Sequence, residues 1–184
     1  MAVDDGEDSK PVPGYVPWIM AVAEEPEESW LERQKMQTKC IGELSQAAFL
    51  LKAHSMGFAV SVPWGDSEKY DFVVSWGPNG RLLRVQVKAT LSLNRRGYAI
   101  QPIYTTLLEG KKAYTAEEID VFVAHVQPCD AWYLLPIRAV EGVKSLTFYP
   151  DTETRNPLWE KYREAWNWLQ VARRRRRESR KRRR

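Results

Sequence analysis

The first strong hydrophobic pattern in the chain predicts an amphipathic helix over residues 38–56. Its apolar positions recur at the spacing of one helix face and form a stripe: Leu44, Ala47, Ala48 and Leu51. Thr38 is a plausible N-cap, and Gly57 suits the position just after the helix. A short strand is expected to follow at once, over residues 58–62.

The central pattern is a predicted β-hairpin over residues 70–90. Two β-rich runs flank the turn sequence of residues 77–80, Gly-Pro-Asn-Gly. In the second run, alternation sends Leu83, Val85 and Val87 to one face and Arg84, Gln86 and Lys88 to the other. A turn centred between residues 78 and 79 places Asp71 opposite Gln86; a bulge would shift this register by one residue.

Further elements are expected on both sides of this hairpin. A second hairpin is predicted from the strands of residues 120–127 and 132–137, around a turn at residues 128–130. The other expectations are an acidic helix or a linker over residues 24–37, a strand over 98–104, a loop over 107–113, a short strand over 145–149, and a helix with one apolar face formed by Leu158, Tyr162, Trp166 and Leu169. Helices and strands in this order predict an α/β domain with a mixed central sheet flanked by helices.

Charge is divided unevenly along the chain and changes this picture at the two ends. Residues 173–184 hold ten basic residues and one acidic residue, whereas residues 1–34 hold nine acidic and two basic residues. The organisation expected is an acidic, partly disordered extension (1–37), a core domain (38–150), a C-terminal helix (151–172) and an arginine-rich tail (173–184). The tail suits sequence-independent contact with DNA phosphates; a solvated tail or a nuclear-import signal are the alternatives.

Cysteine usage and hydropathy bear on the compartment. Cys40 and Cys129 are far apart and show no metal-ligand spacing, which favours a reduced intracellular protein. No apolar run approaches membrane-spanning length, and the acidic start is unlike a secretory signal. We therefore expect a cytoplasmic protein associated with nucleic acid and no membrane partner.

The hairpin register gathers a carboxylate, an amide and an ammonium group on one sheet face. Asp71, Gln86 and Lys88 suit metal-assisted phosphodiester chemistry, because Mg²⁺ prefers oxygen ligands and a lysine can orient water or stabilise phosphate charge. The hairpin alone equally suits an edge with polar residues on its wet face. Glu43 also has two interpretations: a favourable partner of the helix dipole, or a carboxylate on the rim of the site.

The order of these motifs resembles the PD-(D/E)XK nuclease superfamily, in particular the branch of group I intron homing endonucleases and Holliday-junction-resolvase-like proteins. The matching residues cover roughly 38–137: Lys39 with Gly42-Glu43, then Gly57-Phe58, Pro63 with Gly65-Asp66, Tyr70-Asp71, the run from Arg84 to Lys88, and Ile119 to Phe122 before a strand ending at Pro136. Tyr70 replaces the family's proline, Gln86 its usual acidic residue, and Ala89 a frequent Thr or Ser. The resemblance implies a restriction-endonuclease-like core.

The resemblance also implies roles for individual residues. Asp71 would be the central metal ligand, joined by Gln86, Glu43 and the backbone carbonyl of Val87, and Lys88 would be the catalytic lysine. The implied activity is Mg²⁺-dependent cleavage of DNA, with Mn²⁺ as a substitute metal. A homodimer or higher symmetric oligomer is expected if both strands are cut, with the helix of Leu158–Leu169 as the candidate interface. The alternatives are a non-catalytic DNA-binding module of the same fold, and an assembly protein with a tryptophan-rich interface.

DNA contacts are expected from basic and polar residues outside the metal site. These are Arg84 on the central hairpin, Asn94, Arg95 and Arg96 in the loop that follows, and Arg173, Arg174 and Arg175 at the start of the tail. For the loop of residues 94–97, an exposed basic turn without a ligand is the alternative.

Overall fold

In the computed structural model the described residues are 27–65, 67–77, 80–94, 97–106, 108–151 and 158–171, with side chains described from residue 37 to residue 170. The chain divides into two compact units, residues 1–36 and residues 37–184. The expected disorder of the acidic extension and of the arginine-rich tail falls outside the described residues. Within them, no helix is both long and apolar enough to cross a membrane.

The helices and strands are short apart from the first helix. The helical elements are α1 (Glu27–Ser55), α2 (Ile137–Val140), α3 (Asn167–Val171) and the 3-10 turns η1 (Gln127–Cys129) and η2 (Glu160–Tyr162). The strands are β1 (Phe58–Ser61), β2 (Phe72–Trp76), β3 (Leu83–Thr90), β4 (Leu93–Asn94), β5 (Gly97–Ile100), β6 (Ile103–Thr106), β7 (Gly110–Ala113), β8 (Val121–Val126), β9 (Ala131–Pro136) and β10 (Leu146–Phe148).

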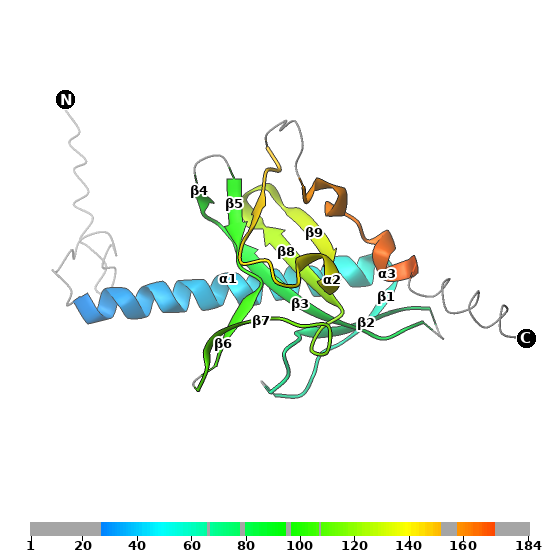
Figure 1. Cartoon of the computed structure of the whole chain (residues 1–184), viewed down its shortest axis with the longest axis horizontal. Coiled ribbons are helices and arrows are strands. Elements are labelled where there is room, and N and C mark those ends of the chain that lie inside the picture. The colour runs from blue at the N-terminus through cyan, green and yellow to red at the C-terminus, as the bar shows by residue number, and fades with distance from the viewer. Residues whose placement is uncertain are drawn as a thin grey trace, which may run out of the picture. The chain divides into compact units, whose positions relative to one another are not determined.

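The central sheet is mixed, as the sequence predicts, with the strand order β1-β2-β3-β8-β9 (Figure 1). β3 pairs antiparallel with β2 and parallel with β8, which in turn forms the predicted second hairpin with β9. The register of the central hairpin is confirmed, since Phe72 lies opposite Val85 and Val74 opposite Leu83. The backbone N–H of Gly80 donates to the carbonyl of Gly77 at 3.1 Å and closes the predicted turn.

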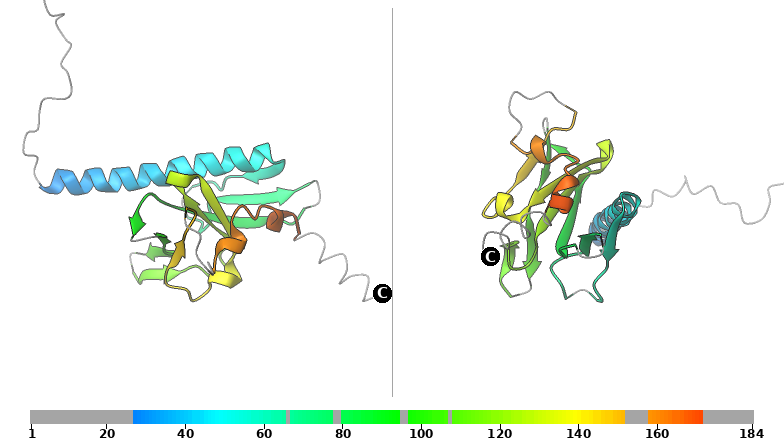
Figure 2. Two further views of the ribbon diagram at one scale, coloured as in Figure 1. Left: turned by 90° about the horizontal axis from the view of Figure 1, so that it is seen from above. Right: turned by 90° about the vertical axis from the view of Figure 1, so that its right-hand side faces the viewer.

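Two apolar clusters cover the two faces of this sheet. On one face, Phe49 and Ala53 of α1 pack with Val85 and Val87 of β3 and with Trp166. On the other face, β8 and β9 pack against the small sheet β10-β5-β4 and against α2. Figure 2 (right) looks down α1 and shows the helix on one side of the strands. Strands β8 and β9 are therefore covered on both faces, whereas β3 contributes Val85 and Val87 to one cluster and keeps Arg84 and Lys88 half-buried on its other face.

The predicted apolar stripe of the first helix is wrong. Leu44 is 59% exposed and Leu51 73% exposed, whereas the buried residues of the helix are Ser45, Phe49 and Ala53. The ring of Phe49 stacks on Phe72 at 5.2 Å and on Trp166 at 5.6 Å between centroids. The helix has apolar residues on more than one side, so periodicity alone does not determine which side is buried. The aromatic contacts of Phe49 with Phe72 and Trp166 determine it.

The first helix is longer than predicted, because α1 already begins at Glu27, so Thr38 is not its N-cap and residues 27–37 are helical rather than a linker. Three further elements also differ from the sequence prediction. The strand expected over residues 98–104 is two strands, β5 and β6, because Pro102 between them has no backbone N–H for a ladder. The loop expected over residues 107–113 contains β7, which pairs antiparallel with β6. The C-terminal helix is broken into η2 and α3 around Glu164, whose φ of 47° is left-handed.

Candidate active site

The candidate site is built on the central hairpin, at the place where β2 begins and β3 is half-way along. Asp71 directly precedes β2, and its backbone N–H donates to the carbonyl of Val85 at 2.9 Å. The regular register ends at Phe72 opposite Val85, and this bond is shifted from it by one residue. The side chain of Asp71 nevertheless lies beside Gln86 and Val87. Lys88 follows two residues after Gln86 on the same face, as alternation along a strand requires.

The carboxylate of Asp71 is held by donors from β3. Asp71 Oδ2 accepts hydrogen bonds from Gln86 Nε2 at 2.7 Å and from the backbone N–H of Val87 at 2.8 Å. Gln86 Nε2 also donates to the carbonyl oxygen of Val87 at 3.1 Å. Because both neighbours are acceptors, the amide of Gln86 must present its nitrogen here. The side chain of Gln86 is thereby fixed between the Asp71 carboxylate and the Val87 carbonyl.

Burial affects the pKa values of both charged residues in this group, Asp71 and Lys88. Burial raises the pKa of Asp71, while the Val87 N–H, the charge of Lys88 and hydrogen bonds from Gln86 and Gln46 act in the opposite direction. Burial lowers the pKa of the Lys88 ammonium, and the Asp71 charge opposes this. Each charge therefore depends on the other for compensation inside the protein.

An aromatic ring borders the lysine. Lys88 Nζ lies 5.9 Å from the ring centroid of Tyr114, which is buried just after β7. The pKa of Tyr114 is raised by burial first and by the charge of Asp71 second, so its hydroxyl stays protonated. Tyr114 belongs to no motif in the sequence, and the β6–β7 pairing precedes it in the chain.

The first helix contributes a different residue from the one expected. Glu43 is largely exposed and forms an i,i+4 ion pair with Lys39 at 3.7 Å. Gln46, three residues further along, is instead the residue of the first helix whose hydrogen bonding lowers the pKa of Asp71. Helical geometry explains the difference, because Gln46 lies about 60° around the helix from the centre of the buried face formed by Ser45, Phe49 and Ala53, whereas Glu43 lies about 120° from it. The α1 group beside Asp71 is therefore an amide, and the role predicted for Glu43 remains a prediction without a contact to Asp71.

The residues predicted to contact DNA have separate environments. The guanidinium of Arg84 donates to Asp120 Oδ2 at 3.1 Å and to the carbonyls of Ala116 and Glu117, which ties β3 to the turn before β8. Asn94 is exposed at the end of β4. Arg95, Arg96, Arg173, Arg174 and Arg175 lie outside the described residues. Their DNA contacts stay predictions.

A second polar cluster lies between α1 and the β8–β9 hairpin. His125 Nε2 donates to Asp130 Oδ1 at 3.2 Å, and His125 Nδ1 then accepts from the Ser45 hydroxyl at 2.9 Å. The imidazole stacks on Trp132 with 3.7 Å between ring centroids. Ser45 is fully buried, so no substrate reaches its hydroxyl. We assign this Ser–His–Asp arrangement to packing.

Comparison with known proteins identifies the class of this fold and site. The family model of the PD-(D/E)XK endonucleases matches residues 36–169, and the chain belongs to this family. Among solved structures, the chain is similar to the bacterial homing endonuclease I-Ssp6803I, with 30% sequence identity and a TM-score of 0.62. That match covers 72% of this chain and 93% of the other. No curated protein matches the chain.

Proposed function

We propose that this protein is a Mg²⁺-dependent endodeoxyribonuclease whose active site is the group formed by Asp71, Gln86, Val87 and Lys88. The proposal rests on one observation above all. Gln86 Nε2 lies between Asp71 Oδ2 and the carbonyl oxygen of Val87, the two oxygens that a hard cation would take as ligands. The amide hydrogens of Gln86 place a partial positive charge between these two oxygens. A metal cation bound at the same place would provide a full positive charge.

The residues present fit a divalent cation if Gln86 turns its amide. Rotation about the last side-chain bond replaces Nε2 by the amide oxygen and makes Gln86 a third oxygen ligand. In the part of the chain that the structure describes, no three His, Cys, Asp or Glu side chains gather into a metal site. Amide and backbone oxygens are therefore needed here, and Gln46 is the nearest further source. A bound Mg²⁺ would neutralise phosphate charge and lower the pKa of a bound water.

Lys88 supplies the fixed positive charge of the proposed site. Its ammonium is partly desolvated and is balanced by Asp71, so an incoming phosphate oxygen meets a cation that water screens little. We assign to Lys88 the orientation of the attacking water and the stabilisation of charge on the scissile phosphate. Tyr114 restricts the lysine to one side of the site.

The test is cleavage of supercoiled, linear and branched DNA by the full chain in Mg²⁺ and in EDTA. Cleavage in Mg²⁺ that EDTA abolishes and Lys88→Met reduces is the expected result. The matched control is Lys161→Met, because Lys161 also lies over a tyrosine ring, 5.1 Å from that of Tyr162, but in η2. Equal cleavage by wild type and Lys88→Met would remove the assignment of Lys88.

A DNA-binding module without catalysis is the second candidate. The observation in its favour is that Asp71 stands in a group otherwise made of amides and an ammonium, where a carboxylate-rich site would hold Mg²⁺ more strongly. Binding of DNA with no strand breakage in Mg²⁺ or Mn²⁺ would decide for this candidate.

We also propose that the protein acts as a symmetric dimer, with an interface that differs from the one expected. Trp166 and Leu169 of the C-terminal segment are buried in the core, so they cannot serve a partner. Cys40, Leu44, Ala47 and Leu51 are exposed along α1 at alternating spacings of four and three residues, the pattern of a helix–helix seam. Sedimentation of the wild type and of Leu51→Glu tests this: the variant should be a folded monomer.

A further inference from the structure

A second lysine lies close to the proposed active site and is connected to it by aromatic rings. Lys69 precedes Asp71 by two residues, and its Nζ lies 4.7 Å from the ring centroid of Tyr104 on β6. The rings of Tyr104 and Tyr114 are 5.1 Å apart, and Tyr114 in turn borders Lys88. Two ammonium groups thus flank a pair of tyrosine rings that contact each other at a tilt of 41°.

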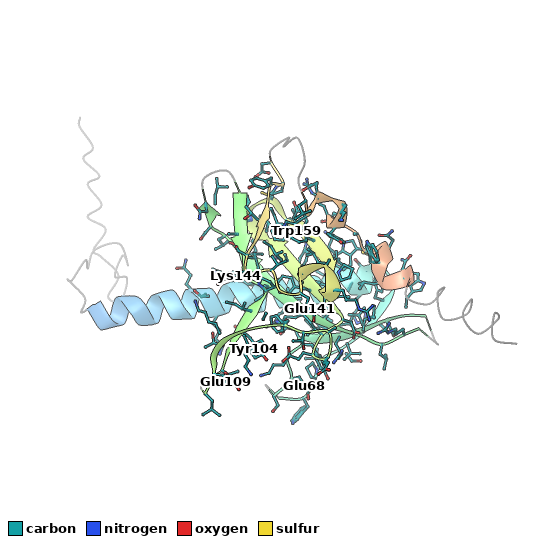
Figure 3. The ribbon with its side chains drawn as sticks, viewed as in Figure 1. Glu68, Tyr104, Glu109, Glu141, Lys144 and Trp159 are labelled. Atoms are coloured by element: carbon teal, nitrogen blue, oxygen red, sulfur yellow. The ribbon has the colours of Figure 1, made fainter. Side chains whose placement is uncertain are left out.

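We propose that Lys69, held on Tyr104, binds a DNA phosphate near the scissile one on the same strand. This inference rests on the proposed function, because Lys88 defines the position of the scissile phosphate. The β6–β7 hairpin would then carry a phosphate subsite rather than serve only as cover for the core. Figure 3 labels Tyr104 on this hairpin and Glu68, the chain neighbour of Lys69.

The spacing of the cations suits a nucleic-acid backbone. Each DNA strand carries a phosphate about every 3.4 Å along the helix axis. Lys88 Nζ, the ring centroids of Tyr114 and Tyr104, and Lys69 Nζ follow one another at 5.9, 5.1 and 4.7 Å, a path long enough for the two ammonium groups to contact different phosphates of one strand. The faces of aromatic rings attract an ammonium group, which holds Lys69 in place while its N–H donors remain available to an anion.

One acidic residue, Glu118, belongs to this environment and acts on both Tyr104 and Lys69. Glu118 accepts hydrogen bonds from the Tyr104 hydroxyl at 2.6 Å and from the backbone N–H of Thr115 at 2.9 Å. The hydrogen bond to Glu118 is the main cause that raises the pKa of Tyr104 to about 12, so the tyrosine remains a donor. Burial tends to raise the pKa of Glu118, but its hydrogen bonds and the charge of Lys69 lower it overall. Glu118 therefore positions Tyr104 and also competes with a phosphate for Lys69.

The experiment measures binding of the full chain to a 30-base-pair duplex of mixed sequence by fluorescence anisotropy, in EDTA, between 50 and 200 mM salt. Lys69→Met keeps the aliphatic chain over Tyr104 and removes the charge. The slope of log K against log salt should become flatter by about 0.9, and the loss of affinity should be about 3.5-fold greater at the low-salt end than at the high-salt end. Lys161→Met is the matched control and should keep the wild-type slope.

A second variant tests the same subsite in the opposite direction. Glu118→Gln removes the negative charge and keeps one of the two acceptor oxygens that Tyr104 and Thr115 use, so DNA affinity should rise. Wild-type slopes and affinities in both Lys69→Met and Glu118→Gln would overturn the subsite. Because EDTA prevents cleavage, the result is independent of catalysis: a protein that cleaves DNA but shows no effect of Lys69→Met retains the proposed function and loses this inference. An altered slope without any cleavage in Mg²⁺ would leave the phosphate contact and remove the nuclease assignment.

Discussion

Gln86 donates its side-chain N–H to Asp71 across the central hairpin, with 2.7 Å between Gln86 Nε2 and Asp71 Oδ2. The same nitrogen donates to the Val87 carbonyl. Any cation that takes both oxygens as ligands must displace this nitrogen. Metal binding and the present hydrogen bonds of Gln86 therefore exclude each other.

The effect of replacing Gln86 on metal affinity should depend on whether the new side chain carries an oxygen that can bind the metal. Gln86→Glu offers a charged oxygen of the same reach and should bind Mn²⁺ at least as tightly as the wild type, since hard cations favour carboxylates. Gln86→Leu removes the oxygen and should bind Mn²⁺ more weakly. Calorimetric Mn²⁺ titration of the folded variants measures both, and equal affinities in all three proteins would strike Gln86 from the metal ligands.

The rotation of Gln86 has its own spectroscopic signature. Its side-chain NH₂ resonance, assigned by its loss in Gln86→Glu, should shift and exchange faster with solvent when Mg²⁺ is added, because both present acceptors are lost. Gln127 serves as an internal control, since its Nε2 donates to Ser45 Oγ and to the Ile41 carbonyl away from Asp71. A Gln86 resonance as constant as that of Gln127 at saturating metal would contradict the rotation.

Asp71→Asn should abolish cleavage while leaving the fold intact. Asparagine keeps an oxygen acceptor for the Val87 N–H but loses the charge that a cation and Lys88 require. Loss of a positioned catalytic group typically lowers the rate about 10²- to 10⁴-fold. Rate measurements beside circular dichroism separate the two effects, and near-wild-type cleavage by folded Asp71→Asn would remove Asp71 from the site.

Deletion of residues 173–184 should weaken DNA binding with little effect on site preference. The segment holds ten basic residues, and each phosphate it neutralises contributes about −0.9 to the slope of log K against log salt. The truncated chain should therefore show a slope flatter by several units in the anisotropy assay. A solvated tail predicts instead an unchanged slope.

His125 should make the fold sensitive to mild acid. Burial lowers the pKa of His125 in the folded protein, so the unfolded chain, with an ordinary pKa near 6.5, takes up the proton first. Unfolding is therefore favoured as the pH falls below about 6.5, by at most about 1.4 kcal/mol per pH unit, until His125 itself is protonated in the fold. Urea titrations at pH 7.5 and 5.5 should show this loss, and it should be smaller in His125→Gln, which has no imidazole to protonate.

The central hairpin was predictable because the residues that determine it are close together in the sequence. The turn of residues 77–80 and the alternation from Leu83 to Lys88 fix both the register and the faces of β3 without any distant partner. For the same reason the placement of Asp71 beside Gln86 follows from the sequence. The mixed sheet was predictable from the order of the elements and from the family resemblance.

What the sequence did not reveal depends on distant contacts. Leu44 and Leu51 give a better apolar stripe than Ser45 and Phe49, yet the aromatic partners Phe72 and Trp166 bury the Phe49 side. That rotation of α1 also brings Gln46, not Glu43, to Asp71. Lys69 and Tyr114 carry no motif: Lys69 meets Tyr104 of β6, and Tyr114 follows β7, which pairs with β6 where the sequence predicted a loop.

The two pairings of β3 differ greatly in the length of chain that they close. The antiparallel pairing with β2 closes a short loop. The parallel pairing with β8, in which Gln86 lies opposite Phe122, closes a much longer stretch of chain. Local contacts form early in folding and distant ones late. Asp71, Gln86 and Lys88 are thus expected to meet in a hairpin that is still open to water, before β8 arrives and before Tyr114 covers the lysine. The arrangement of the proposed metal ligands would then form first. The low-dielectric surroundings, which strengthen the electrostatic interactions of these groups, would be among the last features to form.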